Sequence, residues 1–199
     1  MTLHKIAKPL QIFAVLPILT ANVVSVNPNM VLPAQNNVSN VVVSQNEQNG
    51  PLFGALLDNK QADREEKAKQ IDQYFADRNM PLVGYGKKFV EEAEKNNLPW
   101  NLLPSIAVIE SSGYINACKN PRGLNNGFGW GSCKIAFKSV DEAIETVAFH
   151  LGGNHPKTSH YYKGKDVVAV LNTYNPPQYR HDYVPLVTSV MKKMENQTI

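Results

Sequence analysis

The amino-acid sequence predicts a mainly α-helical domain in its C-terminal 140 residues, preceded by two segments of different character. Residues 60–78 contain neither glycine nor proline and are rich in strong helix formers. Residues 139–151 repeat apolar side chains every three or four positions, the period of one helix face. The first 59 residues carry only two of the 20 basic and two of the 17 acidic side chains, so we expect the soluble domain to follow them.

Residues 1–26 have the order of residues found in a secretory signal. Lys5 and Lys8 precede an apolar run over residues 10–19, and small residues follow it. The run is about half the ~20 apolar residues that cross a bilayer. We therefore expect a signal peptide or a membrane anchor, and export to the cell envelope or the extracellular space. A buried N-terminal helix is the alternative, which Pro17 disfavours.

Residues 27–59 are rich in Asn, Gln, Val and Ser and are nearly uncharged. This composition is typical of a flexible linker. We expect the linker to tether the domain over residues 60–199.

Six helices are expected within residues 60–199. They span residues 60–78, 84–96, 101–111, 139–151, 165–174 and 182–195. Ser139 and Glu142 form a capping-box pattern at the start of the fourth helix. In the second helix we expect the four charged side chains at the C-terminal end to face water: Glu91, Glu92, Glu94 and Lys95.

The segment between the third and fourth helices is rich in glycine and asparagine, which predicts a small irregular or β-hairpin loop. Cys118 and Cys133 lie within it. In an exported chain such a pair favours a disulfide, although two free buried thiols are the alternative. A zinc site is not expected because two further ligands at suitable spacing are missing.

The charge balance and the histidines exclude several classes of function. A net charge of +3 without a basic cluster does not favour nucleic acid as a partner. The histidines lack the spacing of metal ligands, so we expect neither a metal nor another cofactor. We expect a monomer.

Glu110 is the candidate catalytic residue, because it continues the inward-facing stripe of Leu103 and Ile106 on the third helix. Burial and the negative end of the helix dipole both disfavour the carboxylate, so we expect a pKa above the ~4.3 of a free glutamate. Those conditions suit a general acid. The alternative is a structural glutamate that is paired with a buried cation or points outward.

Aromatic, glycine and amide residues near this helix form a candidate sugar-binding surface. Each is also a common packing residue when taken alone. The candidates are Phe128, Gly129, Trp130, Tyr174, Asn175 and Tyr183.

Three patterns resemble the motifs of the lysozyme-like superfamily, particularly bacterial lytic transglycosylases. These are Glu110-Ser111 at a helix end, the glycine-aromatic segment about 17 residues later, and Tyr174-Asn175 near the end of a later helix. The resemblance covers about residues 65–195 and implies a lysozyme-like helical fold. It also implies that Glu110 is the acid that protonates a glycosidic oxygen of peptidoglycan, and that Ser111 lines the cleft.

The middle motif departs from the transglycosylase pattern, since Gly127-Phe128-Gly129 stands where Gly-Leu-Met is usual. This segment and the residues after it are also similar to autolysin-type N-acetylglucosaminidases. Asp182 is the only plausible second carboxylate, and a single acid suits a transglycosylase. The expected function is therefore cleavage of cell-wall glycan strands, of transglycosylase or muramidase type. An N-acetylglucosaminidase and a non-catalytic glycan-binding module are the alternatives.

Overall fold

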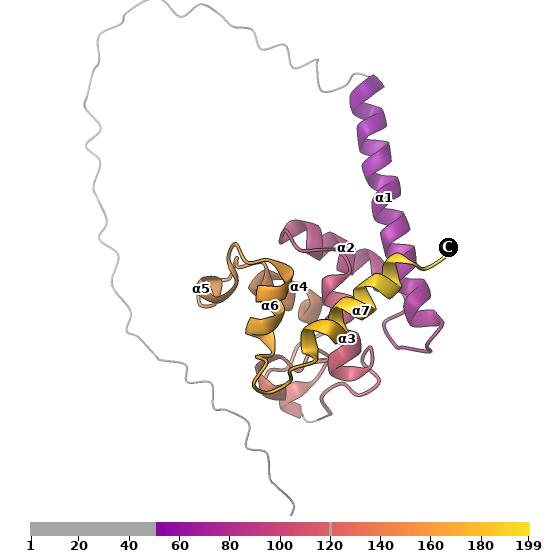
Figure 1. Ribbon diagram of the computed structural model, residues 1–199. Coiled ribbons are helices and arrows are strands. Elements are labelled where there is room, and N and C mark those ends of the chain that lie inside the picture. The colour runs from indigo at the N-terminus through magenta and orange to yellow at the C-terminus, as the bar shows by residue number, and fades with distance from the viewer. Residues whose placement is uncertain (1–50, 120) are drawn as a thin grey trace, which may run out of the picture. The chain divides into compact units, whose positions relative to one another are not determined.

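The computed structural model describes residues 51–119 and 121–199, and this part of the chain is mainly α-helical, as predicted (Figure 1). It contains no β-strand, so the predicted loop is irregular rather than a β-hairpin. The signal or anchor expected over residues 1–26 and the linker up to residue 50 lie outside the described residues. The α-helices are α1 (Pro51–Ala76), α2 (Gly86–Lys95), α3 (Leu102–Ser111), α4 (Val140–Leu151), α5 (Ser159–Tyr162), α6 (Val167–Tyr174) and α7 (Tyr183–Glu195), and two short 3₁₀ helices are η2 (Pro121–Gly123) and η3 (Trp130–Cys133).

Helix α3 is the centre of the domain. It packs against α2, α4 and α7, and its first six residues are all buried. Leu102, Leu103 and Ile106 have no exposed surface, and burying each side chain contributes about 2 kcal/mol. At the start of the helix, buried Asn101 donates from Nδ2 to Glu195 Oε1 at 2.8 Å, which joins this end to the C-terminus of α7.

Helix α1 begins nine residues earlier than predicted, so the last residues assigned to the linker are helical. Pro51 fits the first helical position, where its missing N–H would have no partner in any case. Leu56 and Leu57 are exposed, and Figure 1 shows this end of α1 extending beyond the other helices. Tertiary packing, chiefly against α2, therefore begins only further along α1.

The predicted N-terminal cap of α4 is confirmed. Ser139 Oγ accepts from the N–H of Glu142 at 3.1 Å, and α4 buries the predicted stripe. Helix α3 ends through a left-handed residue at Ser112, with φ at +52°. The next residue, Gly113, also has positive φ, and its N–H donates to Ala107 O at 3.1 Å. Because of this turn, Ser111 is the last residue of α3 and Ser112 caps it.

One prediction for α2 is wrong. Glu92 is only 2% exposed, whereas Glu91, Glu94 and Lys95 are partly or fully exposed. Lys95 Nζ lies 2.8 Å from Glu92 Oε1, and Lys88 Nζ lies 3.0 Å from the same oxygen. The two ammonium groups compensate a carboxylate that the residue pattern alone assigned to the solvent. The four-residue helix α5 was also not predicted, because so short a segment has no period.

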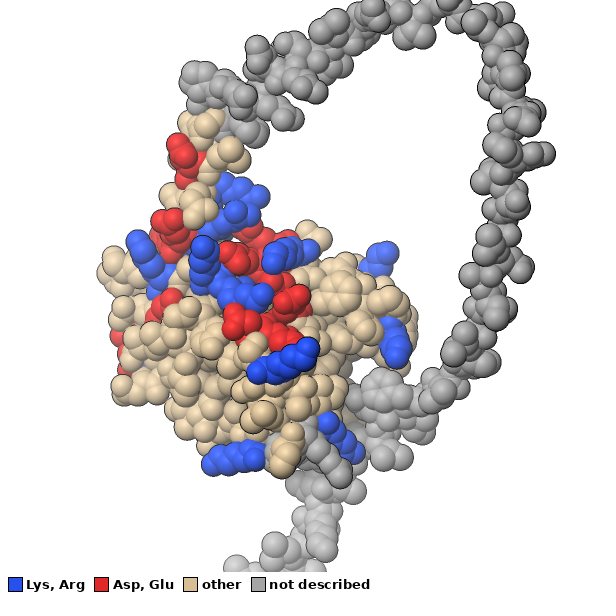
Figure 2. Space-filling model, turned by 180° about the vertical axis from the view of Figure 1, so that it is seen from behind, with Lys and Arg blue, Asp and Glu red and all other residues tan. Residues whose placement is uncertain are grey.

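The surface charges on one face are mixed in sign. Figure 2 shows lysine, arginine and acidic side chains interspersed at the base of the projecting helix. An ion pair between Arg64 and Glu94 joins α1 to α2, and Lys67 pairs with Asp63 along α1. Among the described residues, no helix is both long enough and apolar enough to span a membrane.

The disulfide between Cys118 and Cys133 is present, which confirms the predicted pairing. It closes a loop of 15 residues, and Gly123 packs directly against it. We expect the double substitution Cys118→Ser and Cys133→Ser to lower the free energy of unfolding by about 3 kcal/mol, because the unfolded chain regains loop entropy. Urea denaturation measures this. An unchanged midpoint in the double variant would show that the loop is ordered without the bond.

Candidate functional site

The last turn of α3 and the first residue of α7 bring Glu110 and Tyr183 together. The Tyr183 hydroxyl donates to Glu110 Oε1 at 2.7 Å. Tyr183 is almost completely buried, whereas Glu110 is partly exposed at the end of its helix. A rigid phenol therefore orients a carboxylate that still reaches the surface.

The Tyr183 hydroxyl is held in its protonated form. Burial raises its pKa far above the usual range, and the neighbouring Tyr174 and Glu110 raise the pKa further. The rings of Tyr174 and Tyr183 are stacked, with centroids 6.0 Å apart and planes within 8°. Tyr183 therefore stays protonated around neutral pH and can donate its hydroxyl hydrogen to Glu110.

Gly129 faces the second carboxylate oxygen of Glu110. Its φ of +63° is left-handed, and a Cβ at this position would lie 3.2 Å from Glu110 Oε2. On the same segment, the carbonyl oxygen of Phe128 accepts from the Tyr174 hydroxyl at 2.5 Å. The glycine leaves space beside the carboxylate, and the tyrosine fixes the backbone that passes it.

Asn126 orders this segment from inside. Its side chain has no exposed surface. Nδ2 donates to the carbonyl oxygens of Trp130 and Ile135 at 2.8 and 3.0 Å, and Oδ1 accepts from the N–H of Trp130 at 2.9 Å. From the sequence, the glycines and asparagines of this segment predicted a loop, without a role for Asn126. Its main role in the structure is to satisfy buried backbone groups.

A row of aromatic rings leads away from this site. Trp130 lies 5.8 Å from Tyr174 and 4.9 Å from His150, measured between ring centroids. His150 stacks on His155 at 4.0 Å, and His155 meets the Phe149 ring edge-on at 5.8 Å. We call these six rings, from Tyr183 to Phe149, the aromatic row. Tyr183, Tyr174 and Trp130 were predicted from the sequence. His150, His155 and Phe149 were not, and they belong to α4 and the loop after it.

Three predicted substrate-binding residues do not face the solvent, namely Tyr183, Phe128 and Ser111. Phe128 has no exposed surface and meets Tyr114 edge-on at 5.9 Å, so its ring is part of the core. Ser111 is buried as well. Its Oγ donates to Ala107 O at 3.2 Å and accepts from the N–H of Tyr114 at 3.0 Å. Phe128 and Ser111 therefore stabilise the site from within the core: the ring of Phe128 packs there, and the Ser111 side chain ends α3.

The other predicted residues lie at the surface of the same region. Trp130, Tyr174 and Asn175 are partly exposed, and Asn175 ends α6. Asp182 directly precedes Tyr183 and is half-exposed, with Oδ1 3.4 Å from Arg180 Nε. Its charge is thus engaged with an arginine on the loop before α7.

Comparisons with protein-family models, with curated proteins and with solved structures give no match to this chain. Within the described residues, no group of three or more His, Cys, Asp or Glu side chains is arranged to hold a metal ion.

The His150 imidazole gives a testable dependence of stability on pH. Burial and, to a smaller extent, the charge of His155 lower the pKa of His150 to about 4. An unfolded histidine has a pKa near ~6.5, so below that pH the unfolded state binds more protons. The contribution of His150 is fully present above about pH 6.5 and is lost as the pH falls towards 4. Since the ring is partly exposed, we expect a loss of about 1–2 kcal/mol after allowing for solvent screening.

Thermal melts between pH 7 and pH 4.5 measure this loss. The variant His150→Gln should show a smaller loss over the same range, because it removes the titrating ring. His160→Gln, at an exposed position, is the control and should keep the parent dependence. An equal slope in the parent and in His150→Gln would show that other groups cause it.

Proposed function

We propose that this protein cleaves the glycan strands of peptidoglycan, with Glu110 as the general acid and base. The observation that carries the proposal is the Glu110–Tyr183 hydrogen bond, which fixes a partly exposed carboxyl group at the end of a buried helix. Gly129 beside Oε2 and the rings of Trp130 and Tyr174 nearby support it, because they suit the close approach of a sugar. The resemblance to lytic transglycosylases assigns the same role to Glu110.

In the proposed reaction, the protonated Glu110 carboxyl group gives its proton to the glycosidic oxygen as the bond from that oxygen to C1 breaks. The resulting carboxylate then takes the proton of the hydroxyl group that attacks C1. In a transglycosylase this is the 6-hydroxyl of the same muramic acid residue, and the product is a 1,6-anhydro sugar. In a hydrolase it is a water molecule. Tyr183 holds Oε1 in place through both steps.

A single well-placed carboxyl group favours the transglycosylase route. Ordinary glycosidases need a second carboxylate across the bond. Asp182 is the only candidate that the sequence offered for this role. Its carboxylate is paired with Arg180, which makes it less available as a second catalytic group. The autolysin-type N-acetylglucosaminidase remains the second candidate, since it rests on the same acid and differs in the bond that is cut.

Glu110→Gln is the direct test. Glutamine keeps the shape of the side chain but has no proton to deliver, so release of soluble fragments from purified peptidoglycan should fall by about 10²–10⁴-fold. The melting temperature should remain near that of the parent. Glu66→Gln, at an exposed position on α1, is the matched control and should retain activity.

Mass spectrometry of the fragments identifies the bond and the route. A 1,6-anhydro product is lighter by one water than the hydrolysed one, and the sugar at the reducing end distinguishes a muramidase from an N-acetylglucosaminidase. Parent-like digestion by Glu110→Gln would rule out the proposed acid. A parent protein that binds peptidoglycan without cutting it would favour the glycan-binding module.

Tyr183→Phe tests the positioning of the carboxyl group separately. The variant keeps the buried ring and its stacking on Tyr174 but removes the donor to Glu110 Oε1. We expect the rate of cleavage to fall by about tenfold, which corresponds to one hydrogen bond of ~1.4 kcal/mol in the transition state. The pH optimum should also move, because the hydrogen bond acts on the group that titrates. A normal rate and pH profile would show that the bond is structural only.

A further inference from the structure

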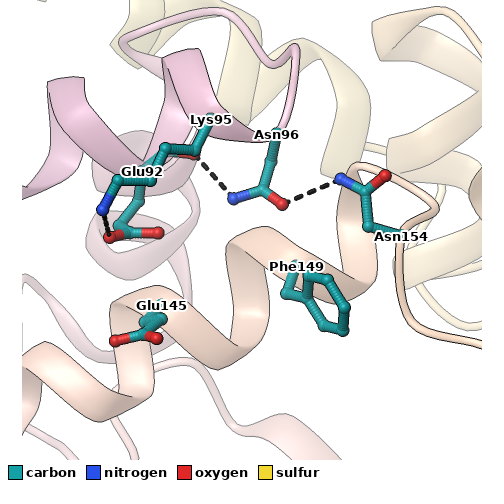
Figure 3. Close-up of a pocket in the computed structure, with 6 residues that line it drawn as sticks. All are labelled: Glu92, Lys95, Asn96, Glu145, Phe149 and Asn154. Atoms are coloured by element: carbon teal, nitrogen blue, oxygen red, sulfur yellow. Dashed lines mark hydrogen bonds and ion pairs between the residues drawn. The ribbon is translucent and has the colours of Figure 1, made fainter.

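A surface hollow of about 680 Å³ lies between α2 and α4, away from the residues that surround Glu110. Figure 3 shows that one wall comes from the end of α2 and the other from α4, with the loop after α4 closing one side. The residues that line it are Glu92, Lys95, Asn96, Glu145, Phe149 and Asn154. Its volume is within the range of small-molecule sites.

A pair of hydrogen-bonded amides, one buried and one exposed, forms one part of the hollow. Asn96 is 5% exposed, donates from Nδ2 to Glu92 O at 2.8 Å, and accepts at Oδ1 from Asn154 Nδ2 at 2.9 Å (Figure 3). Asn154 itself is exposed, and among the described residues its Oδ1 and its second N–H make no hydrogen bond. It therefore offers one acceptor and one donor, either of which can bond the N–H or the carbonyl oxygen of an acetamido group.

The charges around the hollow balance. Glu92 is compensated by Lys95 and Lys88, and Lys88 also lies 3.5 Å from Glu145 Oε2. Two carboxylates thus face two ammonium groups. The lining carries two carboxylates and one ammonium group, and Lys88 beside it brings the local net charge to zero, which favours a neutral ligand over an anionic polymer. The carboxylates and the ammonium group can bond hydroxyl groups. Burying Glu92 and Asn96 here costs free energy that apolar residues would not require, which is typical of a functional surface.

Phe149 supplies an apolar face at the same place. Its ring is 41% exposed, although α4 buries the other face of the helix. The edge-on contact with His155 fixes the ring as the last member of the aromatic row that begins at Tyr183. An exposed rigid ring beside amide and carboxylate groups is the combination that sugar rings recognise, by stacking their C–H face and bonding their hydroxyl groups.

We propose that this hollow is a second saccharide-binding site, which takes a neutral N-acetylated amino sugar. The acetamido group pairs with Asn154, the sugar face stacks on Phe149, and Glu145 and Lys95 bond hydroxyl groups. The choice of this sugar rests in part on the proposed function, because peptidoglycan strands carry an acetamido group on every unit. The site would bind a glycan strand at a place other than the bond that Glu110 cleaves.

The test is titration of the full-length Glu110→Gln variant with the β-1,4 trimer of N-acetylglucosamine, followed by NMR. We expect the side-chain amide signals of Asn154 to shift. Phe149→Ala should weaken the affinity read from these signals by about fivefold, the effect of losing one stacking partner. Tyr161→Ala, which removes an exposed ring outside the hollow, is the matched control and should leave this affinity unchanged. If Phe149→Ala lowers the melting temperature, Phe149→Leu keeps the volume and removes only the aromatic face.

The results separate this proposal from the proposed function. Asn154 signals that stay fixed would overturn the second site, even if the Trp130 indole signal shifts and the parent protein digests peptidoglycan. Asn154 signals that respond only to a zwitterionic dipeptide such as Ala-Glu would replace the saccharide with a peptide ligand and also overturn it. Asn154 signals that shift with the trimer, with an affinity weakened by Phe149→Ala and unchanged by Tyr161→Ala, support it. This holds even if Glu110 proves not to be the catalytic acid.

Discussion

The burial of α3 on nearly every side is the constraint on which the rest of the structure depends. Its leucines and isoleucine form the centre of the core, so the helix cannot rotate or slide without exposing them. Glu110 therefore has a fixed position at the one end of α3 that reaches the surface. The Tyr183 hydroxyl at the start of α7 donates to the carboxyl group there, and this hydrogen bond joins the core to the candidate site.

The loop after α3 is irregular and has few regular backbone hydrogen bonds of its own, so other contacts must order it. The disulfide holds its ends and Asn126 satisfies its interior backbone groups. Tyr174 then fixes the carbonyl oxygen of Phe128. Two of these constraints lie within the loop and the third comes from α6, and together they place Gly129 beside Glu110. Glycine suits this position because φ is left-handed and a Cβ would lie 3.2 Å from the carboxylate oxygen.

The aromatic row and the hollow between α2 and α4 show that polar and aromatic groups extend well beyond Glu110. The buried Glu92 with its two lysines is stable only because all three charges are paired. Its position beside Asn96 and an exposed phenylalanine gives the domain a second surface with defined chemistry. Binding at such a surface would add to the binding at the first, because a long strand that occupies both loses less entropy for the second contact.

The sequence by itself determined the helical class, the limits of most helices, the capping box of α4, the disulfide and the place of Glu110 at the end of the inward stripe. These features follow from local spacing and from the choice of residue types, which the chain carries without help from distant segments. Tertiary structure alone decided that Phe128 and Ser111 are core residues, that Glu92 is buried, and that His150, His155 and Phe149 continue the row from Trp130. Those outcomes depend on which side chains meet after α4, α6 and α7 have packed around α3, and a one-dimensional pattern does not contain the distance between residues that are far apart along the chain.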